Sequence, residues 1–169
     1  DTLNSTETAA NYEEEKINNS RLSLSGFYKW SPGTKTSFKL GFLATQLWFD
    51  LNSREINFNT HTFLEAIKGT GSSFLWQPYV QLSYHPHPRL MLNAGVHSMT
   101  LSMNKSKAID PRFSMKYRFT DQTDVALAWG RQSSMQTPGI YFTSVDGINF
   151  PNRSLPLIHS DQWVLALTH

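Results

Sequence analysis

The chain has 169 residues, and 15 Lys and Arg against 13 Asp and Glu leave a formal net charge of +2. This length suits one domain or a piece of a larger one, and so small a charge excludes binding to nucleic acid through charge alone. Aromatic residues make up 13% of the chain, which excludes a disordered protein. The absence of cysteine excludes disulfides and thiol catalysis, and no apolar run reaches the ~18 residues of a membrane helix.

Residues 1–19 are polar, include the acidic run Glu13–Glu15, and contain no apolar core of a signal peptide. We interpret them as a loop, extracellular in the topology derived below, followed by a structured domain over 20–169. From Arg21 onward the hydrophobic period is two, which is the period of strands. The breaks in this pattern predict seven strands, over 21–30, 36–49, 73–84, 90–101, 111–119, 125–134 and 160–168.

The connections between these strands alternate in length. The breaks at 31–35, 85–89 and 120–124 are short and carry turn residues such as Pro32 and Gly33. The other breaks, at 50–72, 102–110 and 135–159, are longer. An antiparallel meander with short periplasmic turns and long extracellular loops is typical of a transmembrane β-barrel, and strands of about 9–11 residues are long enough to cross a bilayer.

Aromatic residues gather at both ends of the predicted strands. Trp30 and Tyr84 lie beside short turns, while Trp48, Trp76 and Trp163 lie near long loops. Two such belts are expected where aromatic rings sit at the two membrane interfaces. Large aromatic residues also fill the core of a soluble sandwich, but the opposite face of these strands repeats charged, amide and small residues, as a wet barrel lumen requires. The expected fold is all-β, an antiparallel meander of about seven strands forming part of a transmembrane β-barrel.

The second half of the chain resembles a known family. The residues that carry the likeness are Leu92–Ser98, Ile109–Tyr117, Leu127–Gln136, Ile140–Phe142 and Ser160–Leu167. They are similar to the barrel of TonB-dependent receptors, of the type that often bears an N-terminal carboxypeptidase-regulatory-like domain, with Asp110 where Glu is commoner and Trp129 where Tyr is commoner. The resemblance covers about 72–169 and is weak before that.

The resemblance implies an outer-membrane receptor of a Gram-negative bacterium that takes up a bulky nutrient, such as a siderophore or a glycan. Its implied partners are outer-membrane lipid, the remaining barrel strands and plug of a parent receptor, and a TonB-type energy-transducing protein acting through the plug. The chain contains neither a plug nor a segment that would contact that partner, and seven strands is an odd number where bacterial barrels have even ones. We therefore expect an internal piece of a receptor barrel.

No catalytic, metal or cofactor site is predicted. His85 and His87 could form a metal pair, but histidines beside prolines in a tight turn are more often turn residues. His97 alternates with the residues expected to face lipid, so it should face the lumen, where a ligand could contact it. Polar residues are common on a lumen wall, so an ordinary wall residue is the better interpretation. Ser133 and Ser134 lack the glycine pattern of a nucleophile elbow, so the chain is not expected to be an enzyme.

Ligand-binding residues stay unassigned at this stage. Lys116, Arg118 and Arg112 share one face of a predicted strand and could attract an anion, but they also suit an ordinary lumen wall. The long loops hold aromatic residues that could stack on a ligand or pack one loop against another, namely Phe58, His61, Phe63, Tyr141, Phe142 and Phe150.

Two other functions remain open. The first is a soluble all-β binding module, such as a carbohydrate-binding sandwich, which would stay monodisperse in plain buffer. The second is a small passive barrel or adhesin with an eighth strand in residues 1–19, which are too polar and too acidic to favour crossing a bilayer.

Overall fold

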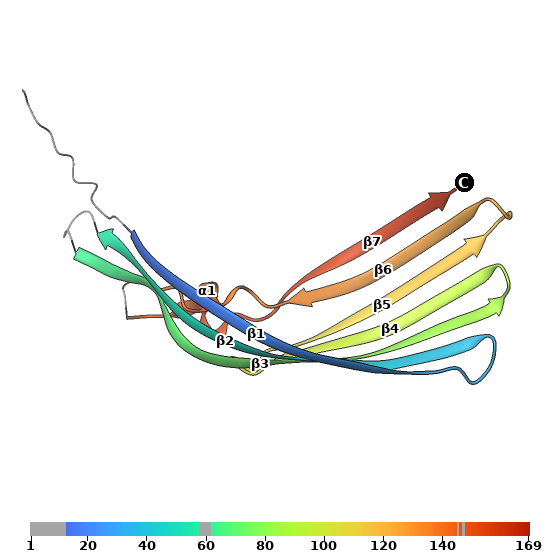
Figure 1. Ribbon diagram of the computed structural model, residues 1–169. Helices are drawn as coiled ribbons and strands as arrows, with labels where there is room; N and C mark the ends of the chain where they lie inside the picture. Colours follow the sequence, from blue (N-terminus) through green and yellow to red (C-terminus); the bar gives the residue numbers. More distant parts are fainter. Residues whose placement is uncertain (1–12, 58–61, 145, 147) are drawn as a thin grey trace, which may run out of the picture.

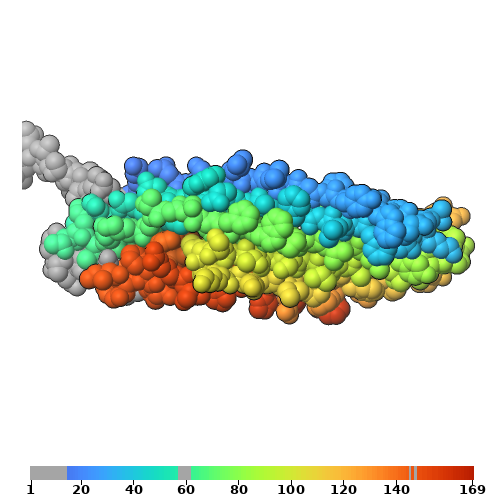
Figure 2. Space-filling model, turned by 90° about the horizontal axis from the view of Figure 1, so that it is seen from below, coloured from blue at the N-terminus to red at the C-terminus, as the bar shows by residue number. Residues whose placement is uncertain are grey.

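The computed structural model describes residues 13–57, 62–144, 146 and 148–169, whose strands form one antiparallel sheet. The seven strands are hydrogen-bonded in chain order, β1-β2-β3-β4-β5-β6-β7, as an uninterrupted meander (Figures 1 and 2). This confirms the predicted all-β class and strand number. The strands are β1 (Glu13–Trp30), β2 (Thr36–Asn57), β3 (Thr62–His87), β4 (Leu90–Leu101), β5 (Lys107–Arg118), β6 (Asp124–Ser134) and β7 (Ile158–Thr168).

The sheet is open. Strands β1 and β7 each pair with one neighbour, so each presents one edge without a partner strand among the described residues. Figure 1 shows the sheet bent into a trough, with the β1–β2, β3–β4 and β5–β6 turns at one end and the other three connections at the other end. We call these the turn end and the loop end. No helix in the described ranges is long and apolar enough to cross a membrane.

The predicted alternation of short and long connections was wrong, because β2 and β3 are separated only by 58–61 and β4 and β5 only by 102–106, which is no longer than the turn 31–35. Only the connection between β6 and β7 is long.

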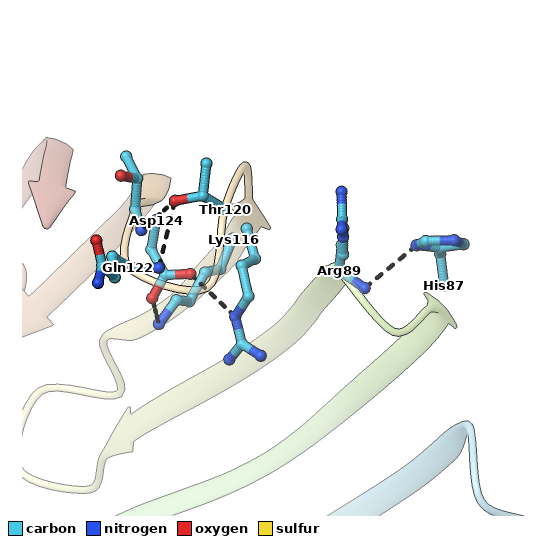
Figure 3. A network of polar contacts seen from close by, with 8 residues as sticks. His87, Arg89, Lys116, Thr120, Gln122 and Asp124 are labelled. Atoms are coloured by element: carbon cyan, nitrogen blue, oxygen red, sulfur yellow. Dashed lines mark hydrogen bonds and ion pairs between the residues drawn. The ribbon is translucent and has the colours of Figure 1, made fainter. Parts of the chain in front are cut away.

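The short turns are held by side-chain hydrogen bonds to the backbone. Between β5 and β6, the Thr120 hydroxyl accepts the N–H groups of Gln122 at 3.2 Å and Thr123 at 3.0 Å (Figure 3). Between β3 and β4, the Nδ1 atom of His87 accepts the N–H of Arg89 at 3.2 Å. Strand β3 thus continues two residues past His85, and the turn is tighter than the predicted break at 85–89.

The strands reach further at the loop end than the sequence predicts. Residues 13–19, interpreted as a loop, belong to β1 and pair with Phe49–Glu55 of β2. Most of the predicted loop 50–72 is a continuation of the β2–β3 ladder, with a register shift between Ser53 and Arg54. The prediction was wrong here because it followed apolar alternation, whereas a ladder of backbone hydrogen bonds can continue where both faces are polar.

The connection between β6 and β7 is the longest and folds back over the sheet. It contains two single-turn helices, α1 (Pro138–Tyr141) and the 3₁₀ helix η1 (Pro151–Ser154), each opened by a proline. We call residues 135–157 the inner loop, because α1 lies inside the bend of the sheet in Figure 1. Its position covers one face of the strands at the loop end.

Candidate functional site

One face of the sheet, here called the apolar face, is apolar along all seven strands. Directly opposite residues of an antiparallel pair share a face, so the register gives its members. Many of them are exposed, such as Leu22 at 66%, Trp163 at 72% and Leu165 at 77%. The members are Leu22, Leu24, Tyr28, Trp30, Phe38, Leu40, Phe42, Trp76, Val80, Leu82, Tyr84, Leu92, Val96, Ile109, Phe113, Met115, Tyr117, Val125, Leu127, Trp129, Trp163, Leu165 and Leu167.

Two aromatic pairs lie on the apolar face, in one line of the register across the sheet. At the turn end of β1, Trp30 stacks on Phe38 of β2 with ring centres 5.5 Å apart. In the middle of β6 and β7, Trp129 lies beside Trp163 at 5.9 Å. On these two strands the tryptophans are the last apolar residues of the face in the direction of the loop end.

On β6 and β7, polar residues follow Trp129 and Trp163 on the apolar face in the direction of the loop end. The Arg131 guanidinium donates two hydrogen bonds to the Asp161 carboxylate, at 2.9 and 3.0 Å. On the β2–β3 hairpin, the Thr70 hydroxyl donates to Asp50 at 2.9 Å. Both pairs lie on the apolar side of the sheet, so polar residues replace apolar ones on the same face. This change comes at a different register position on β6 and β7 than on β2 and β3.

The opposite face, here called the polar face, is lined by cationic, amide, hydroxyl and small side chains. It includes Ser23, Ser25, Lys29, Lys39, Thr45, Gln77, Gln81, Ser83, Asn93, His97, Asp110, Arg112, Ser114, Lys116, Ala126, Ala128 and Gln162. Its buried apolar residues gather at the loop end, where the inner loop covers them. Away from that cover the polar face is open and also carries Phe27, Leu43, Tyr79 and Met91.

The inner loop and the polar face form a buried cluster at the loop end. Sheet residues Phe49, Leu51 and Leu101 pack against Tyr141 and Phe142 of the loop. Tyr141 and Leu101 are fully buried. The rings of Phe49 and Phe142 lie 5.0 Å apart, centre to centre. Of the aromatic residues predicted in the long loops, Tyr141 and Phe142 thus pack a loop against the sheet, while Phe58 and His61 lie outside the described residues.

Gly69 of β3 makes room for this contact. A Cβ atom at Gly69 would lie 2.3 Å from the Phe142 ring, too close for any real side chain. The backbone completes the junction, since the N–H of Lys68 donates to the Phe142 carbonyl at 3.2 Å and that of Ser144 to the Ala66 carbonyl at 2.8 Å. The inner loop is therefore bonded to β3, across a sequence separation of more than 70 residues. Further along the loop, the N–H groups of Asn149 and Ile148 hold the pKa of Asp146 below its usual value.

Asp110 is the most buried ionisable residue of the polar face, with no exposed surface. Its carboxylate accepts the Ser133 hydroxyl at 2.6 Å and the Ser133 N–H at 3.0 Å, and it lies 3.1 Å from Nδ1 of His97. Ser133 and His97 both contact the carboxylate. A serine nucleophile needs its hydroxyl on the base, so this arrangement differs from a Ser-His-Asp relay. The three residues tie β4, β5 and β6 together.

The three basic residues predicted on one strand separate into two groups. Lys116 and Arg118 share Asp124, with Nζ at 2.7 Å and Nε at 3.4 Å from its oxygens (Figure 3). Arg112 makes no ion pair with any residue that the structure describes. It lies in the wall of a hollow of about 580 Å³ on the polar face, also lined by Gln81, Asn93 and His97.

The histidine pair suggested by the sequence is a turn feature. His87 accepts a backbone N–H in its own turn. Within the described ranges no three His, Cys, Asp or Glu side chains gather in a way that could hold a metal ion. Lys29 and Lys39 were not among the candidate residues predicted from the sequence. They share a face and lie directly opposite each other on β1 and β2. Their parity was visible in the sequence, but the register that joins them was not.

Comparison with protein-family models, curated proteins and solved structures finds no match. The two faces of the sheet are therefore the features that bear on function.

Proposed function

We propose that the chain forms part of the wall of a transmembrane β-barrel in the outer membrane of a Gram-negative bacterium. The observation that carries this proposal is the continuous, exposed apolar face on all seven strands. A soluble monomer seldom exposes contiguous apolar patches beyond a few hundred Å², because exposed apolar surface favours association. In a membrane, lipid acyl chains would cover this face, and water would contact the polar face.

The height of the apolar face differs between strands. The face is apolar from Leu22 to Trp30 on β1, about 26 Å at roughly 3.3 Å per residue, and from Trp163 to Leu167 on β7, about 13 Å. At a strand tilt of about 40° these lengths correspond to about 20 Å and about 10 Å, compared with an apolar band of about 25 Å on known barrels. The height on β1 supports a lipid partner, whereas on β6 and β7 polar residues such as Arg131 and Asp161 begin sooner.

The proposed barrel is part of a nutrient-uptake receptor of the TonB-dependent kind. The short turns face the periplasm and the long β2–β3 hairpin and inner loop face the cell surface, as in known outer-membrane barrels. The open edges of β1 and β7 pair with further strands, since unpaired backbone groups cost several kcal/mol each in lipid. The proposed receptor also has a plug and works with a TonB-type energy-transducing protein. The transported solute is a siderophore, a glycan or a similar bulky molecule.

Cysteine scanning tests this proposal, because the chain has no cysteine of its own. Single cysteines are placed at consecutive positions from Phe74 to Tyr84, in outer membranes from cells that make the protein, and are labelled with an environment-sensitive dye. Even positions should give blue-shifted emission that nitroxide lipids quench, and odd positions should give emission that iodide quenches. Uniform iodide quenching at both parities, together with a protein that stays monodisperse without detergent, would instead favour a soluble carbohydrate-binding-like module.

A further inference from the structure

Three cations of the polar face lie in one line across the sheet. The register places Lys29 of β1 opposite Lys39 of β2, and the same line reaches Arg112 of β5. We call this line the cationic row. In order from β1 to β7 it consists of Lys29, Lys39, Gln81, Gly95, Arg112, Gly130 and Gln162, and it contains no acidic residue.

The cations of the row have no counter-charge among the described residues. Lys116, Arg118 and Arg131 each contact an aspartate. Lys16, Arg21 and Lys107 also lack an ion pair with a described residue, but they do not lie in a line with other unpaired cations. None of the three cations of the row forms an ion pair with a described residue, and the nearby Asp110 is occupied by Ser133 and His97. Like charges directly opposite on neighbouring strands are destabilising. An anion from outside this sheet would remove that repulsion.

Lys39 is held in place by aromatic rings. Its Nζ atom lies 4.3 Å from the centre of the Phe27 ring and 5.6 Å from that of Tyr79. Gly41, between these rings in the register, makes the arrangement possible, because a Cβ atom there would lie 2.5 Å from Tyr79. The ammonium group is thus positioned before any ligand arrives, which lowers the entropy cost of binding.

The Arg112 side chain lies along Gly130, where a Cβ atom would come within 3.1 Å of the Arg112 Cγ. Beside it, the hollow of about 580 Å³ offers amide and hydroxyl groups of Gln81, Asn93 and Ser114. A smaller hollow of about 290 Å³ contains Lys29 and Lys39 and shares Gln81 with the larger one. The two hollows place cations at both ends of one polar surface.

We infer that the cationic row binds an elongated solute that carries two or more anionic groups. From β1 to β5 the row spans four strand spacings of about 4.8 Å, or roughly 19 Å. A single small anion cannot reach both Lys29 and Arg112, whereas an acidic oligosaccharide of several residues can. This inference rests on the proposed function, since it makes the polar face the lumen wall that a cargo passes.

The experiment measures binding to the protein purified from outer membranes in detergent, by calorimetry at low salt. The probes are hexagalacturonate for carboxylate groups, a heparin hexasaccharide for sulfate groups, and maltohexaose as the neutral control. The triple variant Lys29→Gln, Lys39→Gln, Arg112→Gln should weaken binding of at least one acidic probe about tenfold or more. Lys116→Gln is the matched control, because Lys116 is on the same face but paired with Asp124, and it should change binding less than about twofold.

Three outcomes overturn the inference. The first is equal binding of maltohexaose and the acidic probes, and the second is equal weakening by Lys116→Gln. The third is a triple variant that binds the acidic probes as well as the unmodified protein does but has a lower thermal stability. This would mean that the row faces an acidic surface of the protein itself. The cysteine scan of 74–84 distinguishes these outcomes from a failure of the barrel proposal. Its alternation of lipid-quenched and iodide-quenched positions does not depend on the cationic row.

Discussion

The loop end and the turn end of the sheet are stabilised in different ways. At the loop end, the inner loop covers the polar face and buries Leu51, Leu101 and Tyr141 in a cluster of the kind found in soluble proteins. Toward the turn end, both faces are open, and Leu24 and Leu40 remain 65% and 60% exposed. The loop end thus has a core of its own, whereas the turn end has none among the described residues.

The largest expected effect concerns the chain on its own. Two open strand edges and an uncovered apolar face leave the turn end without a stabilising partner, so the isolated chain should not form a closed barrel in detergent. Gel mobility with and without boiling after refolding measures this. A fast-migrating monomer that boiling converts to a slower one would show that the seven strands close unaided.

At the loop end, Phe142→Ala should lower the free energy of unfolding by about 3–5 kcal/mol, because it leaves a cavity against Phe49 and Gly69. Urea unfolding of the membrane-extracted protein measures the change. Ile148→Ala is the control in the same loop, since Ile148 is 79% exposed and its loss should cost less than about 0.5 kcal/mol. Similar costs at the two positions would contradict the buried cluster.

In the middle of the sheet, Val80→Arg should cost about 2–4 kcal/mol near the bilayer midplane, whereas Gln81→Arg should cost little. The two residues are neighbours on β3 but lie on opposite faces. Urea unfolding of the two variants in outer-membrane vesicles from cells that make the protein compares them. Because a slip of one residue exchanges the faces, the reverse order would mean that the apolar face is not the lipid face.

The smallest effect concerns the carboxylate that joins three strands. Ser133→Ala should cost about 1–3 kcal/mol, because the buried Asp110 loses a hydroxyl donor at 2.6 Å and keeps the N–H of residue 133. The exposed neighbour Ser134→Ala should change stability by no more than about 0.5 kcal/mol. Thermal unfolding of the two variants in the same detergent measures the difference. Equal stability of the two variants would mean that the Asp110–Ser133 contact does not stabilise the fold.

The sequence predicts the middle of this molecule well and its loop end poorly. Alternation of apolar residues around Leu40, Val80 and Phe113 arises from the two faces, so the strand number follows from period alone. Pro32 and Gly33 mark a short turn in the same direct way. Residues 13–19 were misassigned because they form a strand without apolar alternation.

The candidate site required register, which a single sequence does not carry. Lys29 and Lys39 are neighbours only because the 31–35 turn sets their pairing. The contact between Ser133 and Asp110 depends on β5 and β6 lying side by side. The packing of Phe142 against Gly69 joins segments from distant parts of the chain, and no local pattern indicated it.

The backbone bridge between Ile67 and Thr143 makes the β2–β3 hairpin and the inner loop one cooperative unit. Neither segment can move away from the other without breaking two backbone hydrogen bonds and exposing Phe142. The amides of Lys68 and Ser144 should therefore exchange with solvent together and slowly, in a single opening event. Any displacement of the hairpin at its outer end would carry the inner loop with it and so uncover the polar face at the loop end.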